Sequence, residues 1–184
     1  MVRTFSIFSW LIISLFFLTI SSRMEVVLAQ EDPCLGGYSD SFRLNGKVEN
    51  RRTYNLSDLQ QHPKSRHITV SYYSGSQGLV TKEYIGVPLI DLLNEAVIIT
   101  DSTHKNDILR KAVLVRATDC YEVVISLGEL MSDFGHQQVL VAFATGDGQP
   151  LDDTEGMARL LVPGDKSGGR NVDNIAMIYV ASAP

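Results

Sequence analysis

The sequence predicts an α+β domain, and three observations support this fold class. Short runs rich in β-branched and aromatic residues recur along the chain, separated by turns that contain Gly, Pro or Asn. Segments with apolar residues at helical spacing are few and short. The sequence contains no internal repeat, low-complexity stretch or linker, so we expect the strands and helices to share one domain.

The first half of this domain is expected to hold strands around one main helix. Alternating apolar residues from His67 to Tyr73 are typical of a half-buried strand, and the glycine-containing turn after it favours a hairpin. Pro88 suits the first turn of a helix, because its missing N–H is not needed there. The expected elements are a strand with a turn over 42–48, a helical turn over 56–61, strands over 67–73 and 79–85, and a helix that begins at 86–88.

The second half is expected to contain more strands and a second short helix. Ser126 and Glu129 have the spacing of a capping box, which predicts a helix through Leu130 and Met131. The segment 138–145 is almost continuously apolar and predicts a central strand covered on both faces. We also expect strands over 112–117, 122–125, 160–162 and 175–180, a solvated loop over 101–107, and a tight connection at 119–121.

The N-terminal segment has the features of a secretory signal peptide. A lone Arg3 precedes an apolar run over 5–20, and Val27 and Ala29 suit the −3 and −1 positions of a cleavage site. We therefore expect a signal peptide over 1–29, an N-terminal arm over 30–41 that starts at Gln30, and one domain over 42–184. The run is short for a stable membrane span, so we expect an exported protein, periplasmic or extracellular, without a span after cleavage.

Charge and cysteine content narrow the possible partners. The formal net charge is −5 and no basic stripe is visible in the sequence, which argues against nucleic-acid binding. The chain has two cysteines, Cys34 and Cys120. In an oxidising compartment we expect a disulfide between them, and the alternative is two unpaired thiols.

A polar loop follows the expected strand over 160–162 and carries a candidate anion site. Its two glycines, Gly168 and Gly169, would let the backbone approach a ligand closely. Three cations near this loop, Arg159, Lys166 and Arg170, could surround an oxyanion with charge-assisted donors. The alternative is that the glycines only form ordinary turns and that the charged side chains are solvated.

Several familiar chemistries are not indicated by the sequence. The four histidines never occur as a spaced pair, so no zinc site is expected. No nucleophile elbow, phosphate-binding Walker loop or dinucleotide glycine fingerprint is present. Carboxylates over 147–155 could hold calcium, but they do not match a hand-type loop, and we expect a solvated acidic loop and no metal site.

Several short motifs follow one another along the chain: Phe42-Arg-Leu-Asn-Gly-Lys-Val, Leu56-Ser-Asp-Leu, Tyr84-Ile-Gly-Val-Pro-Leu-Ile-Asp-Leu-Leu, Asp119-Cys-Tyr-Glu-Val-Val-Ile-Ser-Leu, Gly148-Gln-Pro-Leu and Gly156-Met-Ala-Arg-Leu-Leu-Val-Pro-Gly. Their order resembles that of the molybdopterin-binding domain of the sulfite oxidase family. The resemblance implies that family's α+β fold, with mixed sheets and few short helices, and a pterin-bound molybdenum that performs oxo-transfer. It places Tyr121 at the metal, Arg159 near the pterin or an anionic substrate, and Arg170 in a loop that contacts the pterin.

Departures from the family pattern concern the metal ligand and the charge of the site. Family members ligate molybdenum with a cysteine in a Cys-x-Gly-Asn motif, and the corresponding segment here begins with Tyr73. A phenol does not easily replace a soft thiolate. Asp173 stands where the family usually has a lysine, and it would repel a phosphate. The chain is also shorter than typical catalytic members and lacks the twin arginines of proteins exported with a bound cofactor.

Two hypotheses of different classes follow. The first is an exported binding module without a cofactor, which keeps an anion pocket around Tyr121, Arg159 and Arg170 and binds a small anionic ligand or an envelope protein. The second is a small molybdopterin-dependent oxidoreductase that acts on an oxyanion or a sulfoxide-like substrate. In the second hypothesis Tyr73 or Cys120 ligates the metal. Because a fold alone does not determine function, the site must decide between them.

Overall fold

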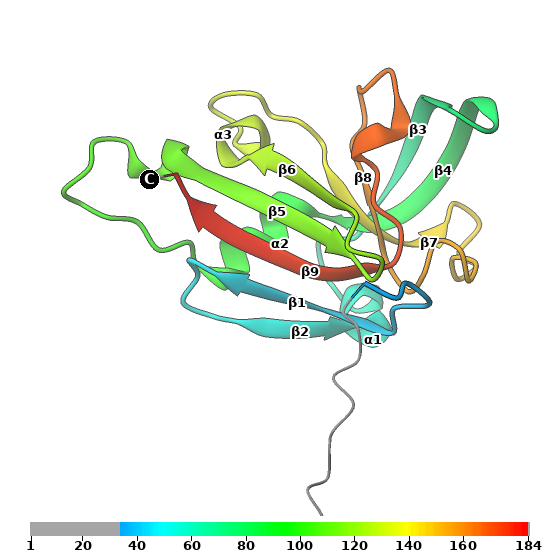
Figure 1. Ribbon diagram of the computed structural model, residues 1–184, viewed down its shortest axis with the longest axis horizontal. Helices are drawn as coiled ribbons and strands as arrows, with labels where there is room; N and C mark the ends of the chain where they lie inside the picture. The colour runs from blue at the N-terminus through cyan, green and yellow to red at the C-terminus, as the bar shows by residue number, and fades with distance from the viewer. Residues whose placement is uncertain (1–33, 184) are drawn as a thin grey trace, which may run out of the picture. The chain divides into compact units, whose positions relative to one another are not determined.

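The computed structural model describes residues 34–183, and its largest element is a five-stranded sheet. The strand order is β2-β1-β9-β5-β6, and all neighbours are antiparallel except β1 and β9, which are parallel. Figure 1 shows these strands side by side, with α2 (Leu89–Ala96) behind them. The strands are β1 (Ser41–Gly46), β2 (Arg52–Asn55), β5 (Lys111–Ala117), β6 (Glu122–Ser126) and β9 (Ile175–Ser182).

A second, four-stranded sheet is antiparallel throughout and has the order β3-β4-β7-β8. Its strands are β3 (Arg66–Ser74), β4 (Gly78–Pro88), β7 (Leu140–Thr145) and β8 (Arg159–Leu161). The register between β4 and β7 shifts at Gly86. A Cβ at Gly86 would lie 2.5 Å from the Val141 carbonyl oxygen, so only glycine allows the two strands to approach this closely.

The helices are short and connect the strands. They are α1 (Leu56–Gln60), α2, α3 (Leu127–Leu130) and the 3₁₀ turns η1 (Asp107–Arg110) and η2 (Gly168–Arg170). Asn55 and Asp58 form a reciprocal capping box that starts α1. Pro88 ends β4 and is the N-cap of α2, so it lies just before the helix instead of in its first turn. Within residues 34–183 no helix has the length and apolarity needed to cross a membrane.

The strand β7 lies between two hydrophobic clusters. Val141 and Phe143 belong to the large cluster that the five-stranded sheet and α2 share, whereas Leu140 and Ala142 belong to a smaller cluster on the opposite face. Side chains alternate between the two faces of a strand, and this explains why the whole run is apolar. The expectation of a central strand covered on both faces is confirmed.

Four further local expectations were wrong. The acidic loop over 147–155 is not solvated throughout, because Glu155 is buried. The strand β2 was not expected, because Tyr54 is its only buried residue and the sequence shows no apolar alternation there. The Ser126 side chain makes no capping hydrogen bond, and the Glu129 carboxylate lies 3.0 Å from Arg170 Nη1. The loop over 101–107 is not solvated throughout: Asp107 is buried and receives a hydrogen bond of 2.6 Å from the equally buried Lys111 Nζ.

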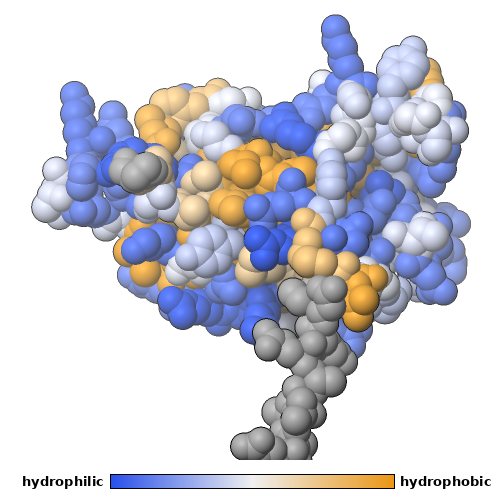
Figure 2. Space-filling model, in the orientation of Figure 1, coloured by the Kyte–Doolittle hydropathy of each residue, from blue (hydrophilic) through white to orange (hydrophobic). Residues whose placement is uncertain are grey.

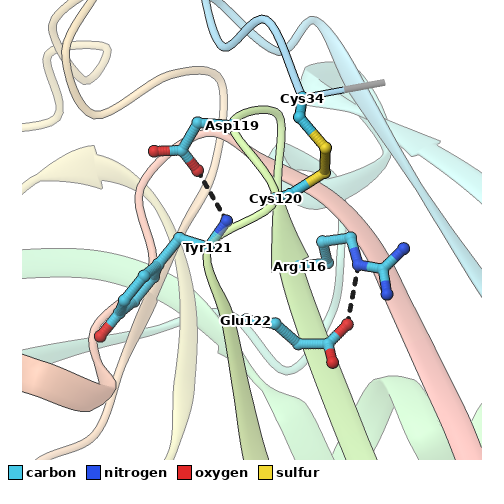
Figure 3. Close-up of a disulfide and its surroundings, with 6 residues drawn as sticks. All are labelled: Cys34, Arg116, Asp119, Cys120, Tyr121 and Glu122. Carbon is cyan, nitrogen blue, oxygen red and sulfur yellow. Dashed lines mark hydrogen bonds and ion pairs between the residues drawn. A yellow bond between two sulfur atoms is a disulfide. The ribbon is translucent and has the colours of Figure 1, made fainter. Parts of the chain in front are cut away.

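A disulfide joins the N-terminal arm to the turn between β5 and β6. Cys34 and Cys120 are bonded, with their Cα atoms 4.9 Å apart, so the expected pairing is confirmed (Figure 3). The turn is tight because the Asp119 carboxylate accepts a hydrogen bond of 2.9 Å from the Tyr121 N–H. Cys120 itself adopts a positive φ of 66°. The bond therefore fixes the start of the described chain beside Tyr121.

Candidate functional site

A polar pocket of about 460 Å³ lies where the β3–β4 hairpin meets the loops around β8. We call it the carboxylate pocket, after Glu155 and Asp173. Its wall also includes Tyr72 and Tyr73 from the end of β3, Lys82 from β4 and Arg159 from β8. Asp152, Thr154 and hydroxyl, amide and backbone groups of residues 74–77, 167–169 and 171 complete the wall. The pocket therefore offers many hydrogen-bonding groups and little apolar surface.

Arg159 forms the floor of this pocket and is only 6% exposed. Its Nη1 contacts the Glu155 carboxylate and donates a hydrogen bond of 2.9 Å to the Tyr84 hydroxyl. The same hydroxyl donates a hydrogen bond of 2.9 Å to Glu155 Oε1. The guanidinium carbon also lies 5.4 Å from the centroid of the Tyr84 ring. Arg159 is therefore a buried cation that the protein itself neutralises, as buried charges require.

Asp173 provides a second carboxylate for the same arginine. Its Oδ1 lies 2.9 Å from Arg159 Nε, an ion pair in which the N–H is not aligned for a hydrogen bond. Partial burial raises the pKa of Asp173, whose side chain is half exposed, and the neighbouring Glu155 and Asp152 raise it further against the opposing effect of Arg159. Lys82 Nζ is 3.9 Å from Glu155 Oε1. The carboxylates in the wall thus outnumber the cations, and two of them already bind Arg159.

The pKa values of Tyr84 and Arg159 show which protonation states these two side chains keep. Burial raises the pKa of Tyr84, so its hydroxyl stays protonated and remains a donor to Glu155. Burial lowers the pKa of Arg159, but Asp173, Tyr84 and Glu155 together outweigh it and raise that pKa. The cluster therefore contains a permanent cation and a neutral phenol.

The glycine loop lies against β3. Tyr73 N donates a hydrogen bond of 2.9 Å to the Lys166 carbonyl oxygen. A Cβ at Gly168 would lie 2.7 Å from the Tyr72 ring, so this glycine permits the close approach of the loop to the strand. Gly168 and Gly169 both line the carboxylate pocket, whereas Lys166 contributes only its backbone to this contact.

Arg170 lies outside the pocket wall and binds carboxylates of the protein itself. Its Nε and Nη2 each donate a hydrogen bond of 2.8 Å to the Asp165 carboxylate, and its Nη1 donates one of 3.0 Å to Glu129. The hydrogen bond from Arg170 lowers the pKa of Asp165. Arg170 therefore connects the glycine loop to α3 instead of facing a ligand.

Tyr121 lines a neighbouring hollow of about 360 Å³. Its hydroxyl donates a hydrogen bond to the Gly169 carbonyl oxygen. This hollow shares Thr154, Asn171 and Asp173 with the carboxylate pocket. The structure thus brings Tyr73, Arg159, Gly168 and Gly169 together but leaves Tyr121, Lys166 and Arg170 outside the wall of that pocket.

Sequence analysis missed Lys82 and Tyr84 as parts of the site. Both lie on β4, two residues apart, and therefore on one face of the strand. The sequence signal that could have indicated this part of the site was a tyrosine with a lysine on the same face of a strand. A buried tyrosine hydroxyl requires a hydrogen-bond partner, so such a tyrosine indicates a polar group nearby. Which carboxylate served as that partner was not visible from local spacing.

The fold is that of a domain of the molybdopterin-binding type. The family model described as "Oxidoreductase molybdopterin binding domain" matches residues 38–184, and the chain belongs to this family. Among solved structures it is similar to the sulfane dehydrogenase SoxCD from Paracoccus pantotrophus, with 23% sequence identity and a TM-score of 0.61. That match covers 76% of this chain and 37% of the other, and it confirms the expected fold. No curated protein matches the chain.

The side chains at the pocket do not fit a molybdenum atom held by a protein thiolate. Both cysteines of the chain are joined in the disulfide, and Tyr73 at the end of β3 is 63% exposed. Asp173, which stands where the resemblance implies a lysine, would repel the phosphate of a pterin. Within residues 34–183, no group of three or more His, Cys, Asp or Glu side chains is arranged to hold a metal ion.

Proposed function

We propose that this protein is an exported binding module that retains the molybdopterin-binding fold without holding molybdenum. The observation that carries this proposal is that both cysteines form one disulfide, so neither offers a thiolate. The residue at the end of β3 is a tyrosine, whose phenol is a poor substitute for a soft anionic ligand. The export part of the proposal depends on the signal-peptide pattern over residues 1–29, which lie outside the described residues.

The charges of the carboxylate pocket favour a protein partner over a small anion. Arg159 is already bound by Glu155 and Asp173, so an anion would have to compete with two carboxylates that belong to the protein. A lysine or a polar side chain of an envelope protein would instead gain from them. We therefore assign this pocket to a cationic or hydroxyl-bearing group of a partner protein.

Titration with a lysine tetrapeptide tests this charge preference. We expect saturable binding by calorimetry at low salt, weakened severalfold in Asp173→Asn. Asp153→Asn is the matched control, because Asp153 is exposed and does not line the pocket. Absence of saturable binding, or equal weakening by the two variants, would contradict the assignment.

Family membership supports the alternative of a small molybdopterin-dependent oxidoreductase that performs oxo-transfer on an oxyanion or sulfoxide-like substrate. In that alternative Tyr73 is the remaining ligand candidate, since Cys120 is joined to Cys34. Arg159 and Tyr121 would then position the substrate. The ion pairs of Arg159 and the hydrogen bond of Tyr121 to Gly169 leave both side chains already occupied, which favours the binding module.

Metal analysis distinguishes the two functions. Protein purified from the envelope of its own host should contain well below one equivalent of molybdenum and release no pterin fluorescence on denaturation. A catalytic member of the family purified in parallel from the same cells would show that the cofactor was available. One full equivalent of either component would establish the enzyme, and loss of that equivalent in Tyr73→Phe would identify the ligand.

A further inference from the structure

A second hollow, of about 570 Å³, lies at the β1–β2 hairpin, away from the carboxylate pocket. Its volume is in the range typical of small-ligand sites. We call it the basic hollow, because four of its lining residues are cations and none is Asp or Glu. The side chains that matter are Arg43, Asn45, Lys47, Arg51, Arg52 and Tyr179.

The basic hollow belongs to the outer face of the five-stranded sheet. Phe42 and Leu44 point into the core, so Arg43 between them points outward. The strand register places Asn45 beside Tyr179 of β9 on that outer face. Figure 2 shows hydrophilic side chains in blue around an orange apolar patch on the face where β5 and β9 lie in Figure 1.

Three of the four cations have no counter-charge in the described part of the chain. Arg52 is paired with Asp58 at 2.6 Å and lies over the Tyr54 ring. Within residues 34–183, Arg43, Lys47 and Arg51 form no ion pair. Gathering unpaired cations in one hollow of a chain with net charge −5 creates repulsion that an anion would relieve.

The backbone that carries these cations is firmly held. Lys47 N donates a hydrogen bond of 2.8 Å to the Val180 carbonyl oxygen, and the Lys47 carbonyl oxygen accepts one of 3.0 Å from Ile99 N. Gly46 has a φ of +95°, and a Cβ there would lie 2.3 Å from the Val180 carbonyl oxygen. Glycine thus permits the close packing of β1 on β9, and the fixed frame lowers the entropy cost of binding.

We propose that the basic hollow binds a small polyanion that carries several phosphate, sulfate or carboxylate groups. Arg43, Lys47 and Arg51 supply the charge-assisted donors, and the arginines can each bind an anionic group in bidentate fashion. The Tyr179 hydroxyl and the Asn45 amide offer neutral donors beside them. Several anionic groups are required because each exposed cation is screened by salt. This site is independent of the carboxylate pocket and of its proposed function.

Calorimetric titration of the full chain with linear inorganic tripolyphosphate tests the proposal. We expect saturable binding to one site that weakens as salt is raised. The double variant Arg43→Gln/Arg51→Gln should bind at least about tenfold more weakly. The matched control Lys64→Gln/Lys105→Gln removes the same charge from exposed positions outside the hollow and should stay within about twofold. The first double variant should also melt no lower than the wild type, because it relieves repulsion.

Parallel titrations identify the source of the anionic groups. Citrate tests a free polycarboxylate, and vesicles with anionic phospholipid test a lipid headgroup. Binding of any of the three probes that depends on Arg43 and Arg51 supports the site. The probe that binds with the highest affinity identifies the source of the anionic groups. Absence of saturable binding to all three, or equal weakening by the two double variants, would overturn the proposal.

Discussion

At the scale of single residues, Arg159 shows how a charge is kept in the interior of this protein. Burying an unpaired guanidinium is costly, and its cost falls only when carboxylates and hydroxyls replace water. Glu155, Asp173 and Tyr84 together perform that replacement. The same contacts reduce the attraction of Arg159 for an external anion, so stability and ligand preference share one cause.

We expect Glu155→Gln to lower the free energy of unfolding by about 2 kcal/mol or more, because it leaves a buried cation with weaker compensation. Urea unfolding followed by circular dichroism measures the change. Asp153→Asn, two residues earlier and exposed, should stay within about 0.5 kcal/mol of the wild type. Equal values for the two variants would show that the Glu155–Arg159 pair is not part of the stabilising core.

Asp173 gives a prediction about pH. Its pKa in the folded protein lies above the ordinary 3.8, because burial and the neighbouring Glu155 and Asp152 disfavour the charged form. The folded state therefore binds more protons than the unfolded chain, and this contribution to stability is full below 3.8 and is lost as the pH rises through the raised pKa. Relative to the wild type, Asp173→Asn should gain stability as the pH rises.

Urea midpoints measured between about pH 3 and pH 7 would test this sign, since the window includes the ordinary carboxylate range. The difference between Asp173→Asn and the wild type isolates one group from the other carboxylates. A difference that is constant with pH, or that favours the wild type as the pH rises, would contradict the prediction.

At the scale of elements, the loop after β8 is positioned by contacts from three sides. Tyr73 in β3 binds its backbone, Arg170 connects it to Glu129 in α3, and Tyr121 after β5 donates to Gly169. The disulfide adds a fourth constraint, because Cys120 is the neighbour of Tyr121. The arm, the β5–β6 turn and the glycine loop therefore form one connected wall around the two neighbouring pockets.

We expect the double variant Cys34→Ser/Cys120→Ser to lose about 2–5 kcal/mol of stability, because the bond closes a long loop of chain. Thermal and urea unfolding measure the loss. Wild-type protein treated with dithiothreitol should behave like the double variant, and the reductant should not affect the double variant. Two free thiols in the untreated wild type under non-reducing conditions would contradict the bond itself.

At the scale of the whole molecule, the charges are separated into two sites of opposite sign. The carboxylate pocket lies beside the β3–β4 hairpin, and the basic hollow lies at the β1–β2 hairpin. The net charge of −5 conceals this separation. A molecule with two such surfaces can contact two ligands of different chemistry, as the proposed binding module would require.

Export is a further property that we propose for the whole molecule, and the pattern that predicts it lies in residues outside the described range. We expect the exported protein to begin at Gln30, as measured by intact mass and N-terminal sequencing. Ala29→Arg should block cleavage because the −1 position requires a small residue, whereas Gln30→Ala should be cleaved normally. An exported chain that retains residues 1–29 would contradict the signal peptide.

The sequence by itself determined those features that depend on local pattern. The alternation over β3, the apolar run of β7 and the helical turn of α1 follow from side-chain periodicity and backbone preferences within a few residues. The order of motifs indicated the family. The tyrosine at the end of β3 was also a sequence observation, because the identity of a ligand atom is fixed by residue type.

Only the tertiary structure decided which charges meet. Arg159 binds Glu155 in the preceding loop and Asp173 near the start of β9, and Arg170 binds Glu129 of α3. The hollow around Arg43, Lys47 and Arg51 exists because β1 pairs in parallel with β9, an element near the opposite end of the chain. Such contacts depend on long-range strand register, and no local spacing in the sequence encodes that register directly.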